Sequence, residues 1–162
     1  MDMSETEMKL RDAATQMKLA LRNMSDDEIV RSCVNAFISE ARSITFVMQR
    51  ESKDTPLEAW YNERMDVLKE MPLLKFFNAS RVYTIHKGVV NPTKHVAPYE
   101  NLVIDGVPCP GTGVISFLRF EDVDKYIPGN SGGVFNLCEE YFLVLKSLVA
   151  EWSAKRRELN TT

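Results

Sequence analysis

The chain has 162 residues, 44% hydrophobic and 27% charged, a composition typical of one folded domain with its own core. Its 20 basic and 23 acidic side chains give a net charge of −3, so the chain as a whole does not attract a phosphate backbone. An acidic N-terminus without a signal-peptide pattern and the lack of a long apolar run exclude secretion by that route and a membrane span.

Three helix starts are predicted from capping residues. Ser4 and Ser25 are each followed three residues later by a glutamate, which is the pattern of a capping box. Thr55 precedes Pro56, which places a hydroxyl at the N-cap and a proline at the first helical position. Each side chain can satisfy backbone amides that a helix start leaves unpaired.

The spacing of apolar residues indicates where these helices run. Apolar side chains recur every three or four positions from Ser25 to Met48 and from Leu57 to Leu68. A fourth segment begins at Pro72 and ends at Gly88, a typical C-terminal stop. The same periodicity returns after Gly133 and predicts a closing helix that ends in a basic run.

The segment from about 92 to 125 has a different pattern. Leu102–Ile104 and Val114–Leu118 resemble strands, and Asp105-Gly106 is a typical hairpin turn. We therefore predict an all-α fold, a four- to five-helix bundle with a small β-hairpin or sheet inserted before the last helix. The whole chain, residues 1–162, is expected to form a single domain.

Two residues of the fourth helix suggest a chemical function. Arg81 can hold a phosphodiester by bidentate hydrogen bonds, and His86 can accept or donate a proton near neutral pH. Together they have the groups needed to cut RNA without a metal ion. Spacing alone favours a structural role, in which Arg81 pairs with a carboxylate and His86 caps its helix. Five residues along a helix also place the two side chains about 140° apart.

The segment from Phe76 to His86 resembles the HEPN domains (higher eukaryotes and prokaryotes nucleotide-binding), whose signature is an arginine followed after four to six residues by a histidine. The resemblance implies a helical bundle, a homodimer that brings two such pairs together, and a metal-independent endoribonuclease of toxin or defence type. It assigns the scissile phosphate to Arg81 and acid–base chemistry to His86. RNA and an antitoxin or other protein are then the expected partners, and the dimer removes the angular objection.

Neighbouring residues complete this hypothesis. Asn78 and Tyr83 are candidates for contacts to the substrate. No cofactor and no metal site are expected, because the chain has no closely spaced pair of metal ligands. The three cysteines are an odd number at wide spacings, typical of reduced thiols, so we expect a cytoplasmic protein.

Two other functions stay open. The first is a non-catalytic helical module whose apolar stripes or β insertion bind a partner protein. The second is a binder of nucleotides or other small molecules, with a pocket between bundle and insertion lined by Trp60, Tyr99 and Phe117.

Overall fold

The computed structural model describes residues 3–104 and 106–159 of the chain. In this part, five α-helices are joined by loops, one two-stranded antiparallel hairpin and a short 3-10 helix. In chain order, the elements are α1 (Glu5–Arg22), α2 (Asp27–Ser52), α3 (Leu57–Leu68), α4 (Pro72–His86), β1 (Thr93–Ile104), β2 (Val107–Arg119), the 3-10 helix (Val123–Lys125) and α5 (Val134–Leu159). The predicted helical bundle with a hairpin before the last helix is confirmed.

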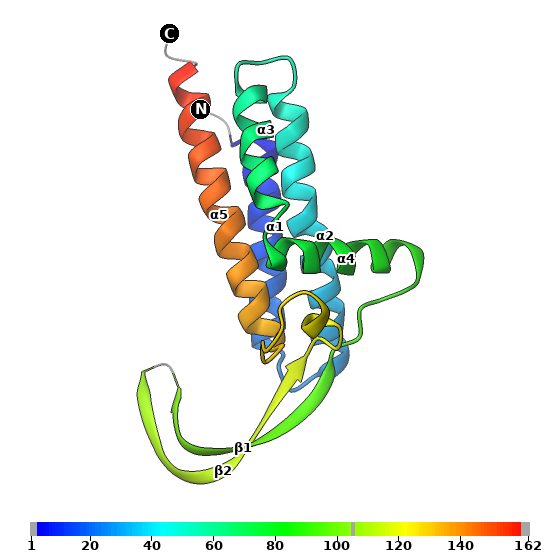
Figure 1. Cartoon of the computed structure of the whole chain (residues 1–162), viewed down its shortest axis with the longest axis vertical. Helices are drawn as coiled ribbons and strands as arrows, with labels where there is room; N and C mark the ends of the chain where they lie inside the picture. The colour runs from blue at the N-terminus through cyan, green and yellow to red at the C-terminus, as the bar shows by residue number, and fades with distance from the viewer. Residues whose placement is uncertain (1–2, 105, 160–162) are drawn as a thin grey trace.

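Four helices form the long body of the molecule. Figure 1 shows α1, α2, α3 and α5 running along its long axis, whereas α4 lies across them. The hairpin leaves the end of the body opposite the two chain termini and curves away from it (Figure 1). Of the predicted hairpin turn, Asp105 lies outside the described residues, and Gly106 has a φ of 79°.

The helix starts match the capping predictions in one of three cases. Ser4 forms the capping box of α1. The prediction of Ser25 as the cap of α2 is wrong, because the carboxylate of Asp26 accepts the first amide hydrogen bonds of that helix. The prediction of Thr55 as the N-cap of α3 is also wrong, because α3 begins at Leu57 and Pro56 occupies the N-cap position. The Thr55 hydroxyl accepts a hydrogen bond from the backbone N–H of Leu57 at 3.2 Å, one residue before that cap.

The core lies between α2, α4 and α5. The rings of Phe77 and Tyr141 stack with centroids 4.3 Å apart and planes only 8° from parallel, and Phe37 meets both edge-on. Burial of Tyr141 raises the pKa of its hydroxyl to about 12, so this ring stays neutral in the core. The crossing helix α4 is thus fixed to the bundle through its first half.

A buried hydrogen bond joins the C-terminal end of α2 to α5. The indole N–H of Trp152 in α5 donates to the hydroxyl of Ser52 at 2.9 Å, and both residues are fully buried. Because no water can replace the serine oxygen there, losing it leaves a buried donor without a partner. This contact joins the last residue of α2 to the last helix of the chain.

We expect Ser52→Ala to lower the free energy of unfolding by about 1–3 kcal/mol, the penalty for an unpaired buried donor. Ser43→Ala is the matched control, since the Ser43 hydroxyl bonds only to the carbonyl of Ser39 in its own half-buried helix turn. It should change stability by no more than about 0.5 kcal/mol. Urea unfolding of both variants measures the difference, and equal effects would contradict the role given to Ser52.

Candidate functional site

The hairpin forms an arm, here defined as residues 93–119. Its two strands pair from Thr93–Arg119 at the root to Ile104–Val107 near the tip, with one irregularity between Glu100 and Leu102. At about 3.3 Å per residue, a 12-residue strand measures roughly 40 Å along its path. Beyond a bridge between Arg119 and Gly133 at the root, no further strand of the described chain pairs with the arm.

The two faces of the arm differ. His95, Ala97 and Tyr99 share one face and are half-buried, and the Tyr99 ring covers Gly113 so closely that a Cβ there would lie 2.8 Å from it. The opposite face is exposed, and we call it the valine face. It is formed by Val96, Pro98, Glu100, Thr112 and Val114, in which the two valines are 66% and 68% exposed.

The root of the arm is held firmly on the β1 side. The amide side chain of Asn35 in α2 donates to the carbonyl of Val90 at 2.7 Å and accepts from the N–H of Val90 at 2.8 Å. This pair of bonds replaces a backbone partner for the segment that leads into β1. In addition, Lys94 Nζ forms an ion pair with Oδ2 of Asp27, the first residue of α2, at 3.6 Å.

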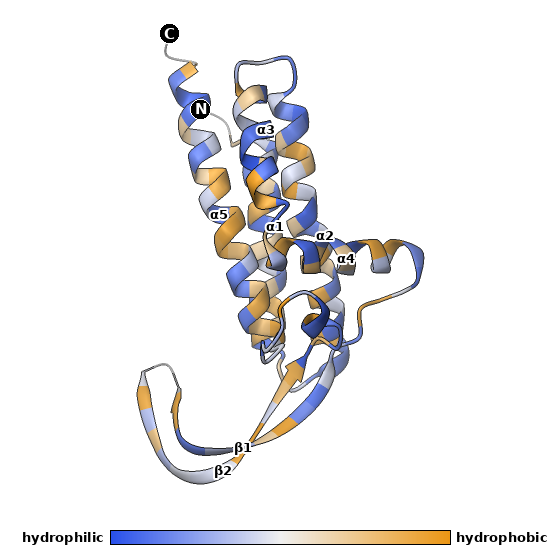
Figure 2. Ribbon diagram, viewed as in Figure 1, coloured by the Kyte–Doolittle hydropathy of each residue, from blue (hydrophilic) through white to orange (hydrophobic). Residues whose placement is uncertain are grey.

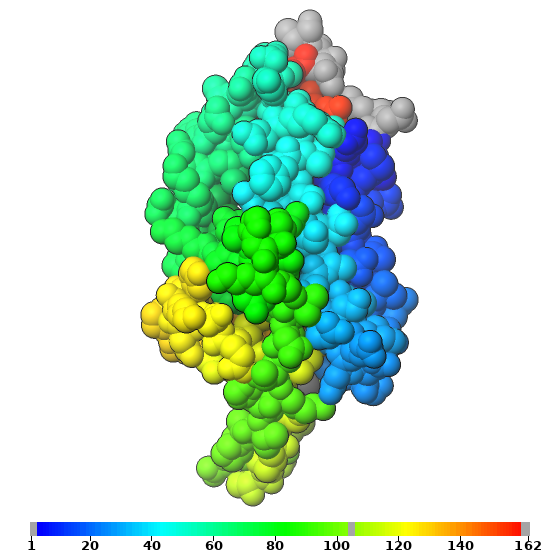
Figure 3. Space-filling model, turned by 90° about the vertical axis from the view of Figure 1, so that its right-hand side faces the viewer, coloured from blue at the N-terminus to red at the C-terminus, as the bar shows by residue number. Residues whose placement is uncertain are grey.

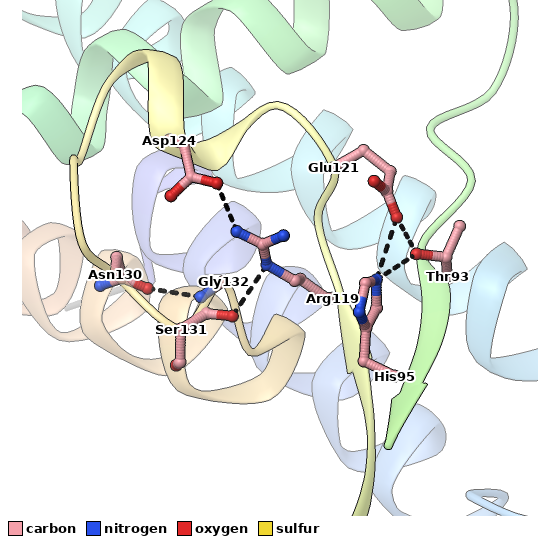
Figure 4. A network of polar contacts seen from close by, with 8 residues as sticks. All are labelled: Thr93, His95, Arg119, Glu121, Asp124, Asn130, Ser131 and Gly132. Atoms are coloured by element: carbon pink, nitrogen blue, oxygen red, sulfur yellow. Dashed lines mark hydrogen bonds and ion pairs between the residues drawn. The ribbon is translucent and has the colours of Figure 1, made fainter. Parts of the chain in front are cut away.

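The β2 side of the root is held by a second set of contacts. Phe120 is buried, and its backbone N–H donates to the carbonyl of Gly132 at 2.9 Å. Figure 4 shows the guanidinium of Arg119 between the Ser131 carbonyl at 3.0 Å and the Asp124 carboxylate at 2.5 Å. The direction of the arm is therefore set at both strands.

A cluster of Thr93, His95 and Glu121 lies beside the root (Figure 4). The hydroxyl of Thr93 and the carboxylate of Glu121 both approach the same ring nitrogen, Nε2 of His95, at 2.9 and 3.2 Å, and they also bond to each other. A nucleophilic triad needs the hydroxyl on one ring nitrogen and the carboxylate on the other. This cluster therefore ties β1 to the loop after β2 and does not have the geometry of a triad.

The second half of α4 projects from the bundle. Ser80 is the last buried residue of the helix, and none from Arg81 to His86 is buried. Val82 and Ile85, three residues apart, are each 56% exposed and form what we call the α4 stripe. Figure 2 shows apolar residues at this end of α4 and along the arm, and Figure 3 shows the end of α4, in green, above the root of the arm.

The four predicted site residues all lie on α4 and differ in burial. Arg81 is half-buried, and its Nε is buried without a hydrogen-bond partner in the described structure. His86, the last residue of the helix, is exposed, and Asn78 is half-buried. Of the four, only Tyr83 lines the hollow described next.

The hollow lies between α4 and the loop after β2. It has a volume of about 340 Å³, and its walls include four aromatic rings, those of Phe76, Tyr83, Phe120 and Tyr126. Three of its charged groups already have partners: Lys125 pairs with Asp122 at 2.6 Å inside the hollow, and Glu121 bonds to Thr93 and His95 outside it. A pocket between bundle and insertion was predicted, but the choice of Trp60, Tyr99 and Phe117 as its lining is wrong, because the arm carries the last two away from the body.

Neither metal ligands nor a membrane segment emerges from the described residues. No three His, Cys, Asp or Glu side chains of residues 3–104 and 106–159 gather closely enough to hold a metal ion. Among the helices described, none combines the length and apolar character needed to cross a bilayer.

Comparison with models of protein families shows which family the chain belongs to. The family model described as bacteriophage lambda protein ea47 matches residues 2–96, more than half of the 162 residues. The chain belongs to the phage lambda ea47 family. The matched range covers α1 to α4 and the first residues of β1. No curated protein and no solved structure matches the chain.

This assignment corrects the HEPN resemblance. The residues that carried the resemblance, Phe76 to His86, lie inside the segment that the ea47 family model matches. The arginine–histidine signature is short, and the structure shows that its histidine stands at the free end of a crossing helix. The ea47-family assignment therefore replaces the HEPN one.

The root of the arm generates a stability prediction with a matched control. Gly132 and Gly129 both have positive φ, 72° and 77°, but only at Gly132 would a Cβ meet other atoms, Arg119 Cγ at 2.7 Å and Val123 Cγ1 at 2.8 Å. Gly129→Ala should lower the free energy of unfolding by about 1 kcal/mol through backbone strain alone. Gly132→Ala should lower it by roughly 1–3 kcal/mol more, because it overpacks the root. Chemical denaturation compares the two, and equal losses would refute the tight packing described here.

Proposed function

We propose that this ea47-family protein is a non-catalytic interaction module whose arm binds another protein. One observation carries the proposal: of the described hydrophobic side chains of the arm, Leu118 at the root is the one that packs against the core. A two-stranded ribbon is only marginally stable in water by itself. A long ribbon with a fixed root and exposed valines is therefore suited to receive a partner that covers it.

The charge of the arm favours a protein over a nucleic acid. Residues 96–118 contain two acidic side chains, Glu100 and Asp105, and no basic ones. Binding to a phosphate backbone depends on lysine and arginine, which release counterions from the nucleic acid. Residues 96–118 have none to offer.

The prolines of the arm favour contact through its face. Pro98 lies in β1, and Pro108 and Pro110 lie in β2. A proline has no N–H to donate, so these residues interrupt the edges along which a further strand would add. The partner is therefore expected to lie on the valine face.

The free cysteines support the placement of the protein in a reducing compartment. Cys33 and Cys138 are buried, Cys109 is half-buried, and all three are free. Burial raises the pKa of the Cys138 thiol, which keeps it protonated and unreactive. We place the protein in the cytoplasm, where thiols stay reduced.

In-cell photo-crosslinking tests the arm directly. A benzoylphenylalanine at Val96 or at Val114 should form covalent adducts with protein when the chain is expressed in bacterial cells and irradiated. The same group at Glu63, an exposed position on α3, is the control and should form none. Equal labelling at all three positions, no adduct from the arm, or adducts that a nuclease removes would each contradict the proposal.

RNA cleavage by Arg81 and His86 is the second candidate function. The unpartnered Nε of Arg81 and the exposed His86 are the observations that favour it. A non-catalytic module should give the same RNA fragments, or none, for the parent chain and for Arg81→Ala and His86→Ala. Gel analysis of a mixed RNA pool measures this. Cleavage by the parent that both folded variants lose would overturn the non-catalytic proposal.

A further inference from the structure

We propose that the occupant of the arm is a second copy of the same chain. The valine face of each arm lies on the α4 stripe of the other copy, and the two contacts are related by a two-fold axis. This inference rests on the proposed function, because it names the partner of the same arm.

The chain has two unpartnered apolar surfaces that its own fold keeps apart. The free end of α4 and the tip of the arm lie on opposite sides of the molecule in Figure 1. Since the arm is fixed at its root by Asn35 on one strand and by Phe120 on the other, it cannot swing across to its own α4. The arm of another copy can reach that helix.

The two surfaces match in shape and in apolar character. Val82 and Ile85 are three residues apart on α4, so they lie on one side of the helix. Val96 and Val114 lie on one face of the ribbon, diagonally across the strand pair. A helix laid on this face covers the valines of one copy and the α4 stripe of the other at the same time.

The two surfaces also have opposite charge. The projecting end of α4 and the residue after it carry Arg81, His86 and Lys87, and α4 contains no acidic residue. The valine face carries Glu100, and the arm from 96 to 118 has no basic residue. An arm therefore approaches the α4 of a second copy with favourable electrostatics.

Two-fold symmetry doubles the buried interface area and closes the assembly at two chains. A stable interface buries about 800 Å² per partner, more than one narrow ribbon on one helix end is expected to provide. A two-fold exchange supplies this contact twice. It also closes the assembly at two chains, whereas a one-way contact of arm on helix would continue into a filament.

Cysteine pairing between two differently tagged chains tests the geometry. Both chains carry Cys109→Ser, which removes the native cysteine of the arm, while the remaining two cysteines are buried. One chain carries Val114→Cys on the valine face and the other Val82→Cys on the α4 stripe. Mild oxidation of the purified mixture should give a disulfide between the two tags. Val67→Cys in place of Val82→Cys is the control, since Val67 is 63% exposed on α3 and lies outside the proposed contact.

Exchanging the charges of Glu100 on the arm and Lys87 after α4 tests whether these two residues face each other across the proposed contact. Glu100→Lys should raise the dissociation constant of the dimer roughly tenfold by placing like charges together, and Lys87→Glu should do the same. The double variant should recover the affinity of the parent, as measured by sedimentation velocity over a dilution series. Loss without recovery in the double variant would overturn this pairing of arm and helix.

The outcomes separate the two proposals. A monomeric protein at all concentrations, or equal disulfide yields for the Val82 and Val67 chains, would overturn the second copy as the occupant. If arm crosslinks in cells then contain other proteins, the interaction module stands with a different partner. If the arm forms no crosslinks at all, the proposed function itself fails.

Discussion

The arrangement of this protein depends on the burial of Phe120. Its ring meets Phe76 with centroids 5.2 Å apart and Phe77 at 6.0 Å, both edge-on, so the end of the hairpin is packed into the same aromatic cluster that holds α4. Phe77 in turn stacks on Tyr141 of α5. One cluster thus fixes the crossing helix, the last helix and the point where the arm leaves the body. Because the arm is fixed there and not farther out, its faces are left for another molecule.

Because α4 crosses the bundle, its second half is left mostly exposed. A helix that lies across a bundle can bury only the part that passes over it, so all buried residues of α4 lie between Leu73 and Ser80 and none follows Ser80. The sequence of the second half nevertheless contains Val82 and Ile85, side chains that a solvated helix end does not need. Apolar residues at the free end of a helix, together with a ribbon that exposes valines, are the features expected of a protein that completes its surface by association.

Local sequence signals predicted much of the fold, and long-range contacts could not be predicted in the same way. Apolar spacing and the glycine at residue 88 located the helices, and strand-like runs around a turn located the hairpin. By contrast, the Asn35–Val90 bonds join residues 55 positions apart, and nothing in the pattern around Asn35 marks it. For the candidate site, the spacing of Arg81 and His86 suggested chemistry, but the direction of α4 relative to the bundle, which decides what surrounds them, is set by aromatic packing at a distance.

Hydrogen–deuterium exchange at low and at high protein concentration tests the central claim most directly, because it reports on every amide without a substitution. If the arm binds the α4 of a second copy, exchange should slow at high concentration in the arm and in the second half of α4, while α1 and α3 stay unchanged. Exchange that is independent of concentration, or that slows only on the body of the bundle, would contradict the account.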